Sequence, residues 1–257
     1  MLYIYLRGGL GNQLFQLCYG MSIASQRGLS VGIVDHYYTI DTSLGDTHRH
    51  SYFDTFYKSL AHLRCDGRSG AILRLPQITD EQSDVDASNI VVSGWFQNWN
   101  KIRDFVPQFR ALFPANRPMK EGTLGIHFRY SDYVSKYAHI YYAQPLDYYI
   151  RAVQWISTQM KVRQVLLFCQ ECDWESFVYP MIQAMTEVDT WTRVQRGSDW
   201  EELNVMQTCT GLITTNSTFS VWAGILGDIP HVVHPTKWYC DGRKEQNVIW
   251  PPAWKAL

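Results

Sequence analysis

The strongest constraint on the fold is a regular alternation of short β-type segments with helical segments in the second half of the chain. After Pro118, apolar runs of strand length alternate with longer amphipathic stretches. Such alternation predicts βαβ units around a mainly parallel sheet, and so an α/β fold. The expected strands are 123–128, 162–168, 187–191, 211–215 and 231–234, and the expected helices are 145–160, 173–185, 200–209 and 217–226.

The first half opens on the same kind of unit, a strand followed by a glycine turn and a helix. Residues 2–6 are rich in β-formers, and 8–11 contain three glycines. Apolar residues then recur at helical spacing from Leu14 until Gly28, which ends the run. Two more strands are expected at 31–34 and 90–94 and a helix at about 101–112, whereas 36–88 reads as loops and short helices.

A boundary is expected at Pro114 and Pro118, because two prolines within five residues interrupt regular structure. The 257 residues are enough for one large domain or two small ones. We therefore predict two lobes, 1–118 and 119–257.

Charge and hydropathy exclude several classes of protein. With 23 basic and 24 acidic residues the net charge is −1, and no basic run marks a nucleic-acid-binding surface. The apolar start 1–6 is interrupted at Arg7, and no apolar run reaches the ~20 residues of a membrane span. We expect a soluble, cytoplasmic protein with no transmembrane segment, and peripheral membrane contact stays open.

The segment 125–133 places a histidine, an arginine and an acid just after an expected strand. His127 and Arg129 are two residues apart, so on a strand they would face the same way. They would project from the strand's carboxyl end, where open α/β sheets bind their ligands. An arginine there can hold a phosphate through two hydrogen bonds, and phosphate groups leave in every nucleotide-sugar reaction. Asp132 follows within reach of the same site.

The glycine turn allows two interpretations. Gly9 and Gly11 resemble the start of a dinucleotide fingerprint, but Leu14 stands where the third glycine should be, and Asp35 is only a weak candidate for the partner acid. The glycines either just connect the strand to the helix, or they bring the backbone close to a ligand at a helix N-terminus.

A second polar turn, 214–220, contains hydroxyl and amide side chains between an expected strand and an apolar helix. It is either an N-cap or an anion site that uses backbone N–H groups and the positive helix end.

Other motifs are interpreted as coincidental. Asp84-Val85-Asp86 resembles a metal-binding DxD but lies in a polar loop, and the single CxxC, Cys169 to Cys172, has no second pair for a zinc site. The histidines show no metal-ligand spacing, so no metal is expected.

Together these segments resemble the α-1,2-fucosyltransferase family, glycosyltransferase family 11. The resemblance extends through most of the chain and rests on the order and spacing of several short motifs. They are 8–16, 94–97, 127–133, 147–149, 198–206, 216–220 and 235–238.

The resemblance implies a GT-B-like fold of two Rossmann-type lobes, with the acceptor side in the N-terminal lobe and the nucleotide-sugar donor bound mainly by the C-terminal one. It further implies an inverting transfer of fucose from GDP-fucose to a hydroxyl of a glycan, without a metal or other cofactor.

The resemblance also implies a role for each matched residue. Arg129 would neutralise the donor's β-phosphate, with support from His127. Gly9, Gly11, Asn12 and Gln13 would border the cleft near the sugar, and Asn216, Ser217 and Thr218 would bind the diphosphate. Asp132 would orient Arg129 or remove the acceptor's proton.

One departure from the family motif HxRRxDY concerns the donor. Its second arginine is replaced by Tyr130. Two alternatives therefore stay open: a different nucleotide sugar, such as a rhamnose donor, and a non-catalytic glycan- or nucleotide-binding module. A third alternative, a nicotinamide-dependent enzyme, rests only on the glycine turn and the α/β pattern.

Overall fold

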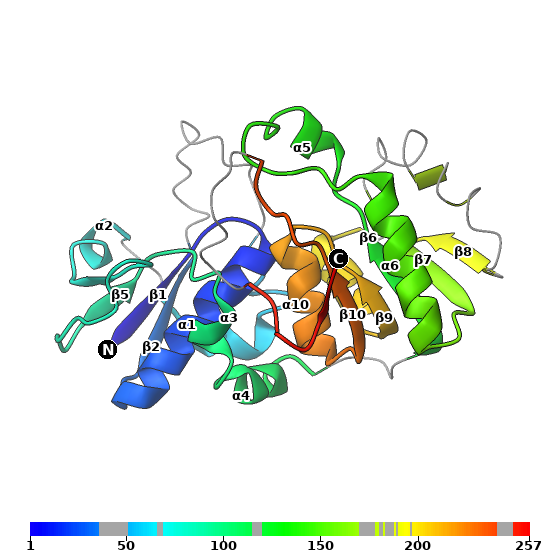
Figure 1. The fold of residues 1–257 in the computed structure, drawn as a ribbon. Coiled ribbons are helices and arrows are strands. Elements are labelled where there is room, and N and C mark those ends of the chain that lie inside the picture. The colour runs from blue at the N-terminus through cyan, green and yellow to red at the C-terminus, as the bar shows by residue number, and fades with distance from the viewer. Residues whose placement is uncertain are drawn as a thin grey trace. The chain divides into compact units, whose positions relative to one another are not determined.

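The computed structural model of the protein divides into two compact units, unit 1 (Met1–Phe113) and unit 2 (Pro114–Leu257) (Figure 1). The structure describes residues 1–35, 51–65, 69–114, 120–169, 178–179, 182, 188, 190–195, 197–240 and 249–257.

Unit 1 is a five-stranded parallel sheet with the order β3-β2-β1-β5-β4. Its strands are β1 (Leu2–Leu6), β2 (Val31–Asp35), β3 (Arg64–Cys65), β4 (Gln77–Ile78) and β5 (Ile90–Val92). Its helices are α1 (Leu10–Arg27), the 3-10 helix η3 (Lys58–Leu63), α2 (Ser69–Ile72), α3 (Trp99–Ile102) and α4 (Val106–Ala111). The strand order reverses between β1 and β5, so the ends of these two strands form the place where an open sheet binds ligands.

The first βα unit forms as the sequence predicts, and glycine explains its close packing. A Cβ on Gly20 of α1 would lie 2.6 Å from the Ile4 side chain of β1, so only glycine lets the helix lie this near the strand. Gly28 ends α1 in the left-handed conformation, at φ 62°, and its N–H caps the last turn.

The prediction of a single helix at about 101–112 is wrong, because the structure has two helices, α3 and α4, separated by 103–105. Pro107 lies in the first turn of α4, where its missing N–H needs no partner. In the middle of one continuous helix the same proline would remove a hydrogen bond and clash with the preceding turn.

Unit 2 is a six-stranded parallel sheet with the order β11-β10-β9-β6-β7-β8. Its strands are β6 (Lys120–His127), β7 (Gln164–Phe168), β8 (Thr190–Arg193), β9 (Cys209–Ile213), β10 (His231–His234) and β11 (Lys255–Ala256). Its main helices are α5 (Ser131–Val134), α6 (Leu146–Gln159), α9 (Asp199–Met206) and α10 (Thr218–Gly227). Counted from β6, the order is the 3-2-1-4-5-6 of doubly wound folds, with the reversal between β6 and β9.

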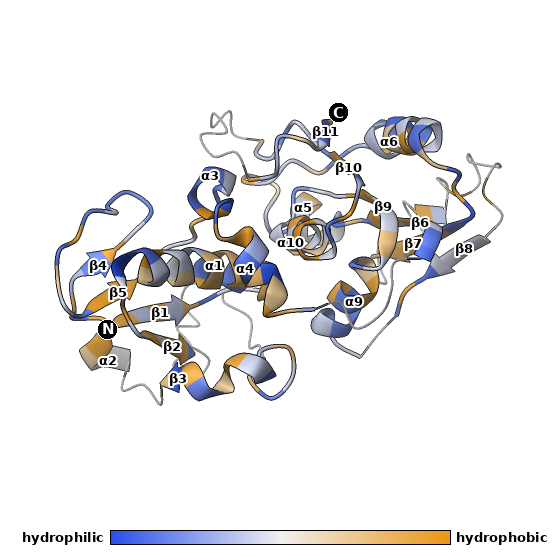
Figure 2. Ribbon diagram, turned by 90° about the horizontal axis from the view of Figure 1, so that it is seen from below, coloured by the Kyte–Doolittle hydropathy of each residue, from blue (hydrophilic) through white to orange (hydrophobic). Residues whose placement is uncertain are grey.

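The core of unit 2 explains its helix pattern. The α6 helix buries five side chains against the sheet, and its other side carries polar residues, so it shows both hydrophobic and hydrophilic colours in Figure 2. The buried members of α6 are Tyr148, Tyr149, Ala152, Val153 and Ile156. They pack with Leu124, Ile126, Val165 and Leu167 of the central strands.

The α/β prediction with two mainly parallel sheets is confirmed. The expected strands and helices of unit 2 are found within a few residues, apart from the helix at 173–185, most of which lies outside the described residues. Strand β11 was not predicted, because two residues of a C-terminal tail carry no periodicity.

Candidate active site

Two polar segments emerge together at the reversal point of unit 2. Strands β6 and β9 are parallel neighbours, with Ile126 paired to Ile213. The residues that follow them, 127–129 and 214–217, therefore leave the same edge of the sheet side by side. The sequence predicted each segment as a site, and the strand order is what brings them together.

Arg129 lies over an aromatic support. Its Cζ is 4.9 Å from the centroid of the Tyr133 ring, and such a cation–π contact stabilises the guanidinium above the ring. The Tyr133 ring is buried and stacks on Tyr141 at a centroid distance of 4.8 Å. The Tyr133 hydroxyl donates a 2.8 Å hydrogen bond to the Asn216 carbonyl oxygen, which ties the arginine segment to the turn after β9.

The turn 214–217 is held by side chains from other parts of unit 2. The Tyr148 hydroxyl donates to the Thr214 carbonyl oxygen at 2.7 Å. The Asn216 amide nitrogen donates to the carbonyl oxygens of Tyr142 at 2.9 Å and Trp238 at 2.8 Å. Both amide hydrogens of Asn216 are thus used inside the protein, so this predicted donor-binding residue shapes the turn through its side chain.

Sequence reasoning missed Tyr133 and Tyr148 as parts of the site. The available signal for Tyr133 was its position four residues after Arg129, a spacing at which side chains meet in a helical turn. Nothing local in the sequence indicates that Tyr148 reaches Thr214, because that contact joins residues 66 positions apart.

Ser217 is the N-cap of α10 and its hydroxyl is buried. Its backbone is extended and its side chain makes no capping hydrogen bond. Its Oγ has no hydrogen-bond partner, although the residue is only 2% exposed. A buried hydroxyl is costly without a partner, and the positive end of a ten-residue helix favours an anion there. Thr218, the next predicted residue, begins that helix.

His127 ends β6 beside the start of α10. Its ring lies 5.5 Å from the ring of Phe219, the second residue of α10. Its Nδ1 is buried and has no hydrogen-bond partner. Burial, together with the neighbouring positive charge of Arg129, lowers the pKa of His127 to about 3. The imidazole is therefore neutral near pH 7, with one ring nitrogen able to donate and the other able to accept.

Asp132 lies in α5, three residues after Arg129 in the sequence. Its side chain is outside what the structure describes, so its role stays a prediction.

The predicted residues of the glycine turn lie in unit 1, after β1. The carbonyl oxygen of Gly9 accepts hydrogen bonds from the backbone of Asn12 and Gln13 at 2.9 and 3.1 Å, and Gly11 is buried in the first turn of α1. The Gln13 side chain donates to the Gly8 carbonyl oxygen at 3.0 Å. These contacts hold the turn.

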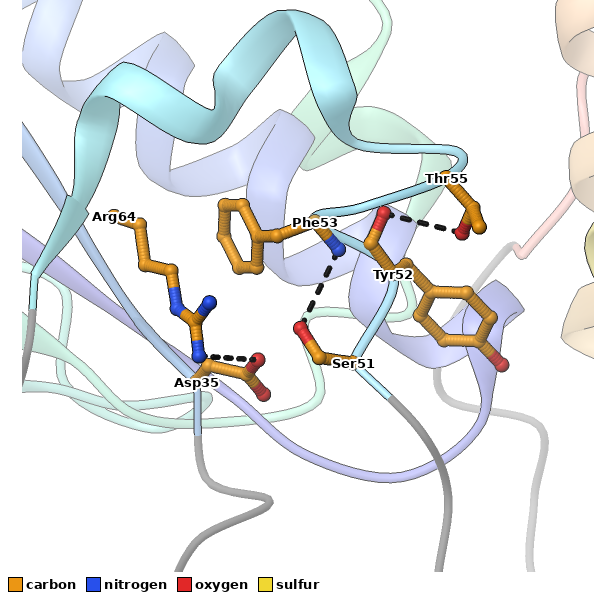
Figure 3. A network of polar contacts seen from close by, with 6 residues as sticks. All are labelled: Asp35, Ser51, Tyr52, Phe53, Thr55 and Arg64. Atoms are coloured by element: carbon orange, nitrogen blue, oxygen red, sulfur yellow. Dashed lines mark hydrogen bonds and ion pairs between the residues drawn. The ribbon is translucent and has the colours of Figure 1, made fainter.

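Asp35, the weak candidate acid for a dinucleotide site, is engaged inside unit 1. It ends β2, and its carboxylate lies 4.0 Å from the Arg64 guanidinium of the neighbouring strand (Figure 3). The same guanidinium lies 5.3 Å from the centroid of the Phe53 ring.

The DxD and CxxC motifs are interpreted as coincidental, and the structure describes the first in full and the second in part. Asp84 and Asp86 are exposed in a loop whose Val85 carbonyl oxygen accepts a hydrogen bond from Arg27. Cys169 directly follows β7, and Cys172, the other cysteine of the CxxC, lies outside the described residues. Over the described ranges, no three His, Cys, Asp or Glu side chains cluster as a metal site requires. No helix within those ranges is long and apolar enough to cross a bilayer.

Comparison with known proteins gives a family and a fold. A family model described as glycosyl transferase family 11 matches residues 103–257. The O-antigen biosynthesis glycosyltransferase WbnK of Escherichia coli is 23% identical over 95% of this chain and 97% of its own length.

Solved structures of glycosyltransferases share the fold. The NodZ α-1,6-fucosyltransferase of Bradyrhizobium, in a crystal soaked with GDP-fucose, has a TM-score of 0.50 and 15% identity, covering 91% of this chain and 94% of its own. The E. coli heptosyltransferase WaaC with ADP has a TM-score of 0.54 and 10% identity, covering 100% of this chain and 92% of its own.

The likeness to these enzymes confirms the predicted GT-B-like fold, and the family match confirms the predicted enzyme class, a glycosyltransferase. The match includes β6, the Arg129 segment and the turn after β9. The chain belongs to glycosyltransferase family 11.

Proposed function

We propose that the protein transfers fucose from GDP-fucose to a hydroxyl group of a glycan, with inversion at the sugar's C1 and without a metal ion. The observation that carries this proposal is the placement of a cation and a buried hydroxyl without a partner on neighbouring segments at the reversal point of unit 2. Arg129, fixed over Tyr133, and the buried Ser217 hydroxyl at the start of α10 lie on neighbouring segments joined by the Tyr133–Asn216 hydrogen bond. A diphosphate needs a cation and directed hydrogen-bond donors.

The donor sugar in this proposal rests on the family and on its relatives. NodZ, which shares the fold, is an α-1,6-fucosyltransferase whose crystal was soaked with GDP-fucose. The proposal retains the prediction that Asn12 and Gln13 of unit 1 lie near the donor sugar.

The proposed reaction is one displacement. The acceptor oxygen forms a bond to C1 of the sugar while the bond from C1 to the β-phosphate oxygen breaks, and GDP leaves with the bonding electron pair. Negative charge grows on the departing diphosphate, and donors fixed in advance stabilise it most strongly in the transition state. Arg129 would supply the charge, and Ser217 with the start of α10 the hydrogen bonds.

The acceptor hydroxyl loses its proton during this step. We assign Asp132 as the candidate base, since an ionised carboxylate can accept that proton. The alternative role, orienting Arg129, predicts a different result for Asp132→Asn. A missing base abolishes transfer and leaves donor binding intact, whereas a missing partner for Arg129 weakens donor binding too.

Tyr130 makes the donor the first thing to test, because it stands where the family motif has a second arginine. Release of the nucleoside diphosphate should be measured from GDP-fucose and, in separate assays, from the alternative donors. These are UDP- and dTDP-sugars, GDP-mannose and dTDP-rhamnose, and each assay is run with and without EDTA. We expect nucleotide release from GDP-fucose alone and unchanged rates in EDTA. Release from another donor would keep the enzyme class and change the sugar, loss of activity in EDTA would contradict metal independence, and no release from any donor would favour a binding module.

A further inference from the structure

Unit 1 contains a second constellation at its own reversal point, between β1 and β5. Arg7 follows β1, and Trp95 follows β5. The Arg7 Cζ lies 4.3 Å from the centroid of the Trp95 ring system. Two amides lie beside them, with the Gln97 Nε2 donating to the Asn12 Oδ1 at 3.0 Å. We call Arg7, Asn12, Trp95 and Gln97 the Trp95 platform.

Trp95 is exposed, and its backbone is rigidly held. It is 39% exposed, one of few large apolar side chains in the described chain that face solvent. Both carboxylate oxygens of Asp80 accept hydrogen bonds from the turn, at 2.7 Å from the Trp95 N–H and 2.7 Å from the Phe96 N–H. Charged acceptors make such bonds strong. The indole is therefore presented to solvent from a backbone that these two hydrogen bonds hold in place.

The turn that carries Trp95 is also strained. Phe96 has φ 50°, a left-handed conformation that is rare for a bulky residue, and its ring is fully buried and stacked on Tyr19 at 4.3 Å. Strain of this kind persists only where surrounding contacts enforce it, and it is concentrated at functional sites. The buried Phe96 thus anchors the turn while its neighbour Trp95 points outward.

The Arg7 side of the platform is equally fixed. The Gln16 side chain accepts a hydrogen bond from the Arg7 N–H at 2.9 Å and donates one to the Arg7 carbonyl oxygen at 3.2 Å. In the described part of the chain no carboxylate forms an ion pair with Arg7, and its buried Nε has no hydrogen-bond partner. Gly8, at φ 77°, lets the chain after β1 lie close to the Trp95 ring, because a Cβ on Gly8 would be only 3.0 Å from Trp95 Cζ3.

The chemistry of this group matches a sugar ring. The exposed part of the indole, which Arg7 does not cover, offers an apolar surface to the C–H face of a pyranose. The guanidinium and the two amides beside it offer donors and acceptors to the hydroxyl groups of the sugar. We infer that the Trp95 platform binds a pyranose of the acceptor glycan. This inference rests on the proposed function, since the acceptor role requires transfer to a glycan.

The test measures sugar binding and donor binding separately in the full chain. Saturation-transfer NMR with methyl glycosides of galactose, glucose, N-acetylglucosamine, N-acetylgalactosamine and glucuronic acid reports sugar binding. Thermal stabilisation by GDP reports both the donor site and correct folding. The variants are Trp95→Ala, Trp95→Phe, which keeps an aromatic face, and Tyr179→Ala, which removes an aromatic side chain that is 51% exposed in unit 2.

We expect at least one glycoside to bind the wild type and Tyr179→Ala equally. Trp95→Ala should weaken that binding about tenfold or more, as truncation of a central tryptophan does, and Trp95→Phe should lie between. GDP stabilisation should be the same in all four proteins.

Two results would overturn the inference: no glycoside binding to the wild type, or glycoside binding that survives in Trp95→Ala. Sugar binding at Trp95 in a protein that GDP does not stabilise would refute the proposed GDP-fucose donor and leave the platform in place as a sugar site.

Discussion

The guanidinium of Arg129 carries the positive charge that we propose stabilises the negatively charged leaving diphosphate. The ring beneath it and the turn beside it are fixed by buried contacts, so the charge is in place before the reaction. Preorganised charge of this kind costs no reorganisation in the transition state.

Replacing Arg129 by alanine should lower kcat by about 10²–10³, the cost of removing one donor aimed at developing charge. The matched control is Arg151→Ala. Arg151 is an exposed arginine of α6 in the same unit, and it pairs with Asp147 at 2.7 Å. Such surface pairs contribute little, so the control should keep near-normal kcat and stability. Near-normal turnover in Arg129→Ala would refute the assignment.

Tyr133 should act as a positioning residue through two separable contacts. Tyr133→Phe keeps the ring under Arg129 but leaves the Asn216 carbonyl oxygen without its donor, which should lower the free energy of unfolding by about 1–3 kcal/mol and change kcat little. Tyr133→Leu also removes the cation–π contact, and should lower kcat more than it raises the donor KM. Equal kcat for the two variants would show that the ring does not position Arg129.

The low pKa of His127 predicts how stability depends on pH. The folded-state pKa of about 3 is below the unfolded value of about 6.5, so the unfolded chain binds the extra proton first. The contribution of neutral His127 to the free energy of unfolding is fully present above pH 6.5 and is lost as the pH falls toward 3. Between pH 7 and pH 5 the wild type should lose up to about 2 kcal/mol more than His127→Asn. Parallel urea titrations at both pH values measure the difference, and equal losses would contradict the buried neutral state.

At the scale of elements, α10 depends on glycine for its fit. A Cβ on Gly227 would lie 2.5 Å from the backbone carbonyl oxygen of Gln207, just after α9, and backbone cannot move aside cheaply. Gly227→Ala should therefore lower the free energy of unfolding by about 1–3 kcal/mol. Gly197→Ala is the control, because its nearest neighbour is a flexible Glu201 carboxylate at 3.5 Å. Equal denaturation midpoints would contradict this packing.

The long helices and strands with periodic hydrophobic patterns could be predicted from the sequence. The short elements could not, because contacts with distant parts of the chain determine whether they form. The α1, α6 and α10 helices and the central strands have strong hydrophobic patterns, and all were predicted. The split between α3 and α4 depends on one proline, and the two-residue strands β3, β4 and β11 exist only because a neighbouring strand pairs with them.

The same limit applies to the site. His127, Arg129 and Ser217 were predicted from strand-end and helix-start patterns, which are local. The contact that joins their segments, from the Tyr133 hydroxyl to Asn216, spans 83 positions, and the Trp95 platform joins residues 85 positions apart. Sequence spacing cannot show such pairs, because strand order alone decides which turns become neighbours.

For the whole molecule, each unit places its polar turn where its own strand order reverses. In unit 1 this point carries the glycine turn and Trp95, and in unit 2 it carries Arg129 and Ser217. Open α/β sheets bind ligands at such points, so we expect a ligand at this edge of each unit. The predicted roles, acceptor side for unit 1 and donor side for unit 2, follow this division and stay proposals.

The most direct test of the donor assignment is thermal-shift binding of GDP, UDP, dTDP and their sugars to the wild type, Arg129→Ala and Arg151→Ala in parallel. A ligand that binds only the folded state raises the melting temperature, and at a fixed concentration the rise is larger the more tightly the ligand binds. We predict that GDP and GDP-fucose alone stabilise the wild type and Arg151→Ala, and that Arg129→Ala loses most of the effect. Selective stabilisation by UDP or dTDP species, or full GDP stabilisation of Arg129→Ala, would contradict it.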